Sequence, residues 1–402
     1  MRALLPCLIA VSAFCTSGRV FGEPWSTQPL IGIVGQYSSN PVLAAGAAQS
    51  ETNAAVVLDA PVNYDSDAFH FTATPNIRYG DASGYSGVTS NFFHLDSSAQ
   101  LNDELGSTSV TAAIYRDSSL LYAGELVNGV GVRRDSSAFG INWQHLLSER
   151  LQVQLAGNTS RALYAENDAA TPTSYDGEIL GTLVDYRYTT FSPALAYAAS
   201  ELNSVRLIGA VGRYEALDGV SASNNASLQL GFDRQLSEIW LLKTTAGYSR
   251  AENRYNYFFG KYLLEQIDST QNGTVYSASL LRQSDVLALN LGVSRALAPT
   301  GFAYLARQES VSALLNYTWS ERWSYSANAS YQTNSYPLNR GTGSYEQRYY
   351  YTALSAVWHL TEQWSVTLQT TKILQRYGSP AITGTSNGVS VQISRQFYRK
   401  DL

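Results

Sequence analysis

The segment from Trp323 to Asn334 alternates strictly between two kinds of side chain. Its odd-numbered positions begin with aromatic residues and alanines, and its even-numbered positions carry serine, asparagine and glutamine. The same alternation returns after Asp285 and again from Leu228 to Asp233. Because successive side chains of a strand point to opposite faces, each of these segments predicts a strand with one apolar and one polar face.

Applied to the whole chain, this pattern predicts about 18 strands. An even number of antiparallel strands is typical of single-chain barrels of the bacterial outer membrane. The sequence therefore predicts an all-β fold, a transmembrane antiparallel up-and-down β-barrel. The expected strands lie near 30–38, 54–64, 68–80, 86–100, 106–116, 132–147, 150–164, 184–198, 203–215, 222–236, 239–252, 273–283, 286–298, 308–319, 322–334, 346–360, 363–376 and 387–397.

The connections between these segments fall into two classes. Four of the short ones share a similar sequence, such as LSERLQVQL from Leu147 and WSERWSYSA from Trp319. Short turns of such barrels face the periplasm and long loops face the outside. We expect the loops Glu166–Gly181 and Asn253–Gly273 to be the segments best able to narrow a pore. The tight turns are expected at 65–67, 102–104, 148–149, 201–203, 237–238, 284–285, 320–321 and 361–362.

The N-terminus has the pattern of a secretory signal peptide. Arg2 precedes an apolar stretch, and a cleavage-like context ends at Gly22, so we expect residues 1–22 to be removed and 23–402 to form the barrel. A lipoprotein signal at Cys15 is the alternative, although Phe14 stands where lipidation favours a small residue. Both cysteines lie in the signal, which leaves the exported chain without disulfides or thiolate metal sites.

Composition narrows the possible classes of protein. Charged residues make up 15% of the chain, against roughly 25% in ordinary soluble domains. The 28 tyrosines and 7 tryptophans suit a lipid-facing wall. A net charge of -5 without a basic cluster argues against nucleic acid as a partner. A secreted β-sandwich or β-solenoid remains the alternative to a barrel in outer-membrane lipid, because alternation alone does not separate these folds.

Six of the seven tryptophans lie close to the short turns. An amphipathic ring that favours the headgroup layer clusters in this way at one rim of a barrel. Packing in a soluble core would not concentrate tryptophan at one class of turn. We therefore expect a periplasmic aromatic girdle formed by Trp143, Trp240, Trp319, Trp323, Trp358 and Trp364.

Side chains on the polar faces of the strands are candidates to line a lumen. Their charges have mixed signs, so they predict no sharp preference for anions or cations. The expected lumen residues are Arg134, Asp233, Lys243, Asn290, Asn328, Gln332 and Arg348.

The sequence offers little catalytic chemistry. The four histidines, including His145 on an outward-reading face, are isolated from one another and lack metal-ligand spacing. No nucleophile elbow or phosphate-binding loop appears. We expect no metal, no cofactor and no enzyme activity, while an outer-membrane lipid hydrolase with a Ser and a His on the lipid face stays open as a minor alternative.

Several segments resemble the β-barrel porin 2 family of outer-membrane proteins. They are YSSNP at 37–41, YRDSSLL at 115–121, VRRDSSAFGINWQHLLSERLQVQL at 132–155 and LVDYRYTTFSPALAY at 183–197. The resemblance extends over most of the exported chain, although these motifs are largely common to barrels in general. Members of the family often accompany exopolysaccharide synthesis and export systems, so the resemblance implies a role in moving a polymer across the outer membrane.

The sequence thus favours a porin-like channel that passes or helps to export saccharide or exopolysaccharide. A barrel of about 18 strands is wide enough for an aqueous channel unless loops fill it. The alternative is a non-conducting barrel that docks a periplasmic export protein through its acidic turns. The sequence leaves the transported species and the oligomeric state open.

Overall fold

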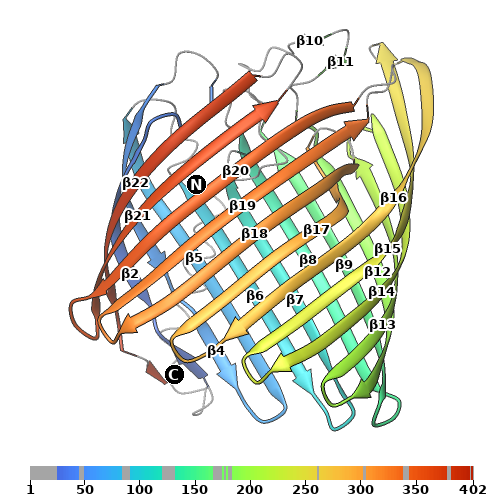
Figure 1. Ribbon diagram of the computed structural model, residues 1–402. Coiled ribbons are helices and arrows are strands. Elements are labelled where there is room, and N and C mark those ends of the chain that lie inside the picture. The colour runs from blue at the N-terminus through green and yellow to red at the C-terminus, as the bar shows by residue number, and fades with distance from the viewer. Residues whose placement is uncertain are drawn as a thin grey trace.

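A computed structural model describes residues 25–44, 49–83, 91–119, 132–165, 174–175, 178–179, 183–259, 262–301, 305–337, 344–377, 382–398 and 400–401. These residues form almost entirely β-structure, arranged as a tall barrel of tilted strands (Figure 1). Within them, no helix is long and apolar enough to cross a membrane. The expected signal peptide, 1–22, lies outside the described residues and stays a prediction.

Eighteen strands make up the barrel wall, as the alternation predicts. The second of them, β3, is interrupted after Asp59 and continues as β4 (Val62–Asp65). The wall strands are β2 (Leu30–Ser38), β3 (Glu51–Asp59), β5 (Phe69–Ser83), β6 (Phe92–Asn102), β7 (Gly106–Ser118), β8 (Arg133–Leu146), β9 (Leu151–Tyr164), β12 (Tyr186–Ser200), β13 (Asn203–Ala216), β14 (Ser221–Ser237), β15 (Trp240–Phe259), β16 (Tyr262–Gln283), β17 (Leu287–Pro299), β18 (Leu305–Ser320), β19 (Trp323–Pro337), β20 (Ser344–His359), β21 (Trp364–Tyr377) and β22 (Ile382–Gln396).

The wall closes between its first and last strands. Each strand pairs antiparallel with its neighbour in sequence, and β2 pairs with both β3 and β22. At the closure Ile33 lies opposite Val56 on one side and Ile393 on the other. Closure pairs the backbone groups that an open sheet would leave at its edges, which lipid requires.

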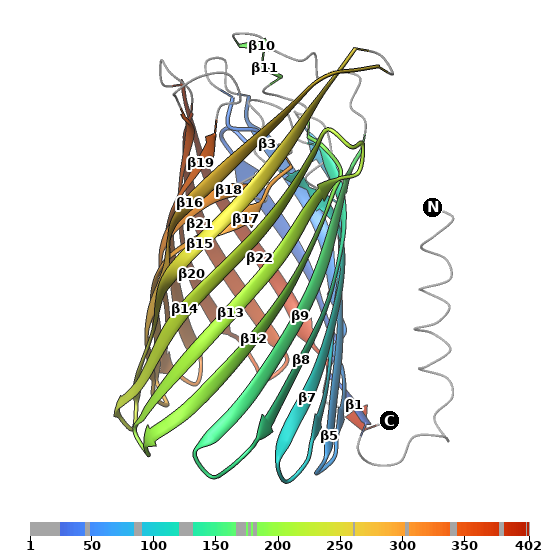
Figure 2. The same cartoon turned by 90° about the vertical axis from the view of Figure 1, so that its right-hand side faces the viewer.

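Short turns gather at one end of the barrel, where the sequence predicts the periplasmic side (Figure 2). All eight expected tight turns fall between consecutive wall strands, so their positions are confirmed. Ser148 and Thr361 stabilise two of them by accepting hydrogen bonds from the backbone N–H of Leu151 and Trp364 at 3.1 Å each.

The expected long loop Asn253–Gly273 is wrong. There β15 and β16 continue as a paired hairpin up to Phe259 and from Tyr262, with Arg254 opposite Asp268. The apolar signal of a strand fades above the membrane because both faces meet water, while backbone pairing continues. Of the other expected loop, 166–181, most residues lie outside the described part of the chain, and the small strands β10 (Ser174–Tyr175) and β11 (Glu178–Ile179) pair within it.

Two shorter strands lie beside the wall at the end with the short turns. There β1 (Trp25–Thr27) pairs with β4 and with β23 (Lys400–Asp401), so the two ends of the barrel sequence meet. The indole of Trp25 packs edge-on against Tyr64, with ring centroids 4.9 Å apart. Both ends of the barrel therefore lie on the periplasmic side.

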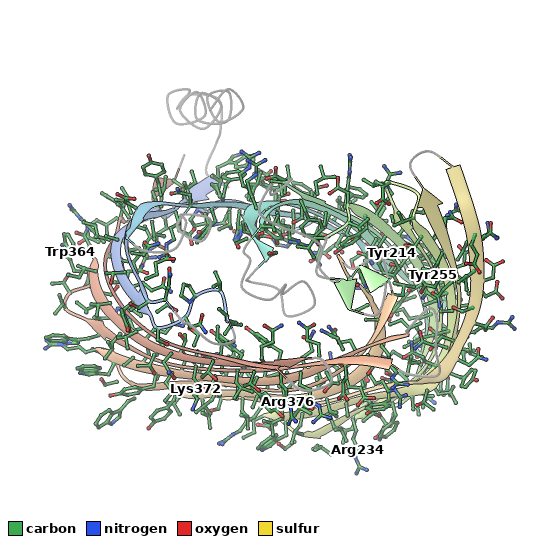
Figure 3. The ribbon with its side chains drawn as sticks, turned by 90° about the horizontal axis from the view of Figure 1, so that it is seen from above. Tyr214, Arg234, Tyr255, Trp364, Lys372 and Arg376 are labelled. Atoms are coloured by element: carbon green, nitrogen blue, oxygen red, sulfur yellow. The ribbon has the colours of Figure 1, made fainter. Side chains whose placement is uncertain are left out.

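The outer surface of the wall is apolar. Leu228, Leu230 and Leu354 on outward positions are more than 60% exposed, whereas their strand neighbours of opposite parity are polar or small and turned inward. In Figure 3 the wall encloses an elongated interior, with Trp364 and Arg234 projecting away from it. An apolar outside around a polar inside is the geometry of a transmembrane barrel. The protein is an integral β-barrel of the bacterial outer membrane.

Candidate functional site in the barrel lumen

The lumen of the barrel is the candidate functional site. Six of the seven side chains that the sequence predicts to line it point inward. Facing residues of paired strands share one side of the sheet, so register and exposure together place each side chain. Asp233 faces Lys243, while the outward Phe232 faces Thr244. By the same reasoning, the inward residues are Arg134, Asp233, Lys243, Asn290, Asn328 and Gln332.

The expected inward position of Arg348 is wrong. On β20 the exposed Tyr350 and Leu354 have the same parity as Arg348, which lies on the outer face and forms an ion pair with Glu346 at 2.8 Å. Three consecutive tyrosines, 349–351, remove the polar alternation at this end of the strand. Tyr349 points inward because it packs against Val42 and Leu43 inside the barrel.

One half of the lumen wall is neutral. Among the described side chains, the inward positions from β17 to β22 carry no Asp, Glu, Lys or Arg, and most are amides, hydroxyls and small residues. An amide ladder crosses this half: Asn334 accepts a hydrogen bond from Gln332 at 3.0 Å and donates one to Gln347 at 3.4 Å. Asn334 and Gln347 are buried.

The other half of the wall carries charges of both signs in close pairs. Arg206 on β13 donates to Asp233 on β14 at 2.8 Å, and Lys243 faces Asp233 from the next strand. Asp233 lies next to both cations and offsets one of them, so opposite charges alternate over a short distance and the group keeps one net positive charge. A solute inside meets local dipoles and no extended field of one sign.

A second charged group lies on β6 to β8. Asp117 is fully buried, and its carboxylate lies 3.2 Å from Nε2 of His94 and 4.0 Å from a guanidinium nitrogen of Arg134. The hydroxyl of Tyr115 donates to Asp96 beside them. The group therefore fixes several polar side chains on one side of the lumen.

A lumen pocket of about 480 Å³ lies between the first strands and the last ones. This volume falls within the range of about 300–1,000 Å³ that is usual for small-ligand sites. Arg78 contributes a guanidinium that donates to Gln36 at 2.9 Å. The remaining lining combines amides and aromatic rings with aliphatic side chains, hydroxyls and the carboxylate of Asp59; its amides and rings include Asn76, Phe92, Tyr351, Gln369 and Gln392.

Two segments from the extracellular side fold against the inner wall, and neither is expected from the alternation of polarity along the strands. The first lies between β2 and β3, where the side chains of Val42 and Leu43 are buried against Tyr349 and Ile373. The carbonyl of Leu43 comes so close to Gly384 that a Cβ at 384 would lie 2.1 Å from it. Only glycine fits at this approach.

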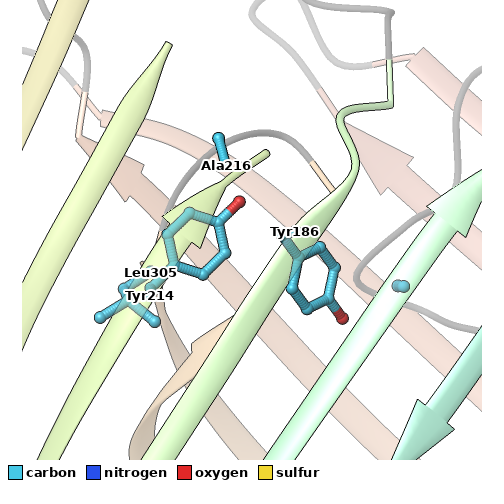
Figure 4. Packing of buried hydrophobic residues seen from close by; sticks show 5 residues of the cluster. Tyr186, Tyr214, Ala216 and Leu305 are labelled. Atoms are coloured by element: carbon cyan, nitrogen blue, oxygen red, sulfur yellow. The ribbon is translucent and has the colours of Figure 1, made fainter. Parts of the chain in front are cut away.

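The second segment, Pro299–Gly301 between β17 and β18, reaches β12 and β13. We call it the lumen bridge. The hydroxyl of Tyr214 donates to the carbonyl of Thr300 at 3.1 Å, and the backbone N–H of Val184 donates to that of Gly301 at 2.7 Å. Leu305 packs beside Tyr214 in a buried cluster (Figure 4). Short Gly- and Pro-bearing connections were the only sequence signal for these two segments.

The six expected girdle tryptophans lie on the outer face next to the short turns. Trp323 and Trp358 stack with ring centroids 5.6 Å apart and an interplanar angle of 3°. The guanidinium of Arg282 lies over Trp240 at 5.6 Å, and that of Arg395 lies over Trp364 at 5.7 Å. Trp240 and Trp364 thus combine an apolar ring with a charged neighbour, as amphipathic residues of a membrane interface do.

The described residues offer little for catalysis or metal binding. No group of three or more His, Cys, Asp or Glu residues among them could hold a metal ion. His145 lies on the outer face and stacks on Trp143 with centroids 5.6 Å apart. It is thus part of the periplasmic rim.

No family model matches the chain, and no curated protein does. The resemblance to the β-barrel porin 2 family therefore has no support from these searches. Among solved structures, Pseudomonas aeruginosa OpdO aligns with a TM-score of 0.47 and 11% identity, over 94% of this chain and 99% of that one. P. aeruginosa OccK2 (OpdF) in complex with glucuronate aligns at 0.44 and 11%, over 94% and 100%. The ferric citrate transporter FecA aligns at 0.45 and 9%, over 94% and 79%.

Proposed function

We propose that the protein is a diffusion channel for neutral, hydroxyl-rich solutes, with saccharides as the substrate class. The observation that carries this proposal is the neutral half of the lumen wall, whose amides and hydroxyls can exchange hydrogen bonds with a sugar. Ion-selective pores instead use rings of one charge. The lumen pocket adds Phe92 and Tyr351, whose rings give the apolar face of a sugar a surface to lie on.

Reconstituted protein tests this proposal. Planar bilayers should show stepwise conductance with weak selectivity between K⁺ and Cl⁻, and proteoliposomes should swell in neutral mono- and disaccharides. A barrel without conductance, or one with strong selectivity for one ion sign, would contradict the proposal.

Variants of the lumen pocket test the sugar specificity. Replacing Asn76 and Gln392 by leucine removes two amides and leaves the wall intact, so sugar-driven swelling should fall while ion conductance changes little. Gln229→Leu on β14 is the matched control, because this amide also faces inward but does not line the pocket. Equal loss of swelling in both variants would show that the pocket has no special role.

A non-conducting docking barrel is the second candidate. It is favoured by the two segments that fold against the inner wall, because they narrow the lumen from the extracellular side. Co-purification with a periplasmic export protein, together with silent bilayers, would support it. The export of exopolysaccharide rests on the family resemblance alone, and loss of surface polysaccharide after deletion of the gene would test it.

A further inference from the structure

The outer face of the barrel carries arginines at its extracellular rim. On β9 and β12, Arg161 and Arg187 face each other directly in the register, and both are exposed. Like charges directly opposite one another destabilise a sheet. Within the described part of the chain neither guanidinium forms an ion pair or a hydrogen bond. Glu215 faces Arg187 across β12 and β13 but is ion-paired with Arg213, so the protein offsets the repulsion only in part.

A groove of about 690 Å³ lies beside this pair on the outer face of β12 to β15. Arg187, Arg213 and Arg250 line it. Phe191 lies two outward positions below Arg187 on β12, and Val211 lies one outward position below Arg213 on β13. The groove therefore offers positive charge above an apolar floor. Arg213 and Arg250 form ion pairs with Glu215 and Glu252. Together with Arg161 and Arg187, the arginines of this region exceed the glutamates by two positive charges.

The height of the pair matches the surface of the membrane. Outward side chains on β12 are apolar or aromatic from Phe191 to Tyr197, and Tyr197 lies near the periplasmic end. Arg187 and Tyr197 are ten residues apart, which corresponds to about 33 Å along a strand and, at a tilt of about 40°, to roughly 25 Å along the membrane normal, the height of the apolar band of such barrels. Arg187 thus lies at the level of the outer-leaflet headgroups.

The same arrangement recurs on another part of the rim. Arg348 on β20 faces Arg376 on β21, with Leu374 lying below on the outer side. Arg348 forms an ion pair with Glu346, and Arg376 interacts electrostatically with the same carboxylate without forming an ion pair of its own. The rim therefore carries two separate pairs of facing arginines, each with one glutamate beside it.

We propose that the outward arginines at the extracellular rim, centred on Arg161 and Arg187, bind the phosphate groups of an anionic, multiply acylated lipid of the outer leaflet. Each guanidinium can donate two parallel hydrogen bonds to a phosphate. The phosphate relieves the repulsion between the two arginines, and the acyl chains lie against Phe191 and Val211 below. Inorganic phosphate has no acyl chains to pack against Phe191 and Val211, so it should bind less tightly.

Binding of bis-phosphorylated lipid A to the purified, folded barrel tests the proposal, with the dephosphorylated lipid as the second probe. Native mass spectrometry in a neutral detergent should show at least tenfold stronger retention of the phosphorylated form. The double variant Arg161→Gln, Arg187→Gln should lose most of this preference. Arg234→Gln is the matched control, because Arg234 is an exposed outward arginine at the periplasmic rim of β14, and it should behave like the wild type.

Thermal unfolding in the same detergent gives an independent readout. Without lipid, the double variant should melt at nearly the same temperature as the wild type, because the repulsion between the arginines and the attraction between Arg187 and Glu215 are lost together. With phosphorylated lipid, only the wild type and Arg234→Gln should gain stability. Equal binding by the double variant, no discrimination between the two lipids, or an equal gain with inorganic phosphate alone would each overturn the proposal.

Discussion

Replacing Tyr214 by phenylalanine tests whether the lumen bridge controls the pore. The substitution keeps the ring in its fully buried place and removes only the hydroxyl that donates to the carbonyl of Thr300 at 3.1 Å. A hydrogen bond of this kind contributes about 1 kcal/mol to stability. Since about 1.4 kcal/mol corresponds to a factor of ten, release of the bridge should become about fivefold more frequent in this variant.

Single-channel recordings provide the assay. We expect the wild type to step between a lower conductance, with the bridge against β13, and a higher one, with the bridge released. Tyr214→Phe should raise the time in the higher state about fivefold, by the same free-energy estimate. Tyr188→Phe is the matched control, because Tyr188 bonds to Asn225 within the wall and not to the bridge. Unchanged dwell times in Tyr214→Phe, or an equal change in both variants, would refute this reasoning.

Three further predictions concern the bridge, the lumen charges and the aromatic rim. In Gly301→Val, a Cβ would lie 2.8 Å from both the hydroxyl of Tyr164 and Cδ2 of Leu183, so the bridge should be displaced and the mean conductance should rise. Asp233→Asn leaves the positive charges of Arg206 and Lys243 uncompensated. A unit charge about 4 Å from an ion in water changes the energy of that ion by about 1 kcal/mol, so the anion-to-cation permeability ratio, measured from reversal potentials, should rise several-fold. Lys243→Gln should lower this ratio. A double-mutant cycle on Trp323 and Trp358, with alanine at each position and urea unfolding from lipid vesicles, should give a coupling of about 0.5–1.5 kcal/mol; zero coupling would argue against the stacked pair.

Much of the barrel could be predicted from the sequence because a membrane imposes a simple rule on each strand. Lipid on one side and water on the other force polarity to alternate, and the alternation survives even where no single residue is informative. The turns at Ser148 and Thr361 could be placed for a related reason, since their side chains cap the turn by local hydrogen bonds. Strand order follows from chain order, because every wall strand pairs with its neighbour.

The wrong predictions concern residues beyond the lipid bilayer, where polarity no longer has to alternate along a strand. Above the lipid, β15 and β16 meet water on both faces, so the sequence between Asn253 and Gly273 has the polar composition of a loop although its backbone continues the hairpin. Next to Arg348 the alternation is interrupted by consecutive tyrosines. Tyr349 faces the lumen, where it packs against Val42 and Leu43, whereas Tyr350 faces outward. Contacts of that kind join residues that lie about 300 positions apart in the chain, and no local pattern encodes them.

The sequence by itself determined that this chain forms a closed barrel with a polar interior, because alternation over two residues depends only on neighbouring positions and on the contrast between lipid and water. Only the tertiary structure decided what the interior and the rim contain. It brings Tyr214 to Thr300 across the lumen, separates a neutral half of the wall from a charged half, and places Arg161 opposite Arg187 on the outside. These juxtapositions depend on register and on the curvature of the whole wall, which are properties of the closed barrel and not of any one segment.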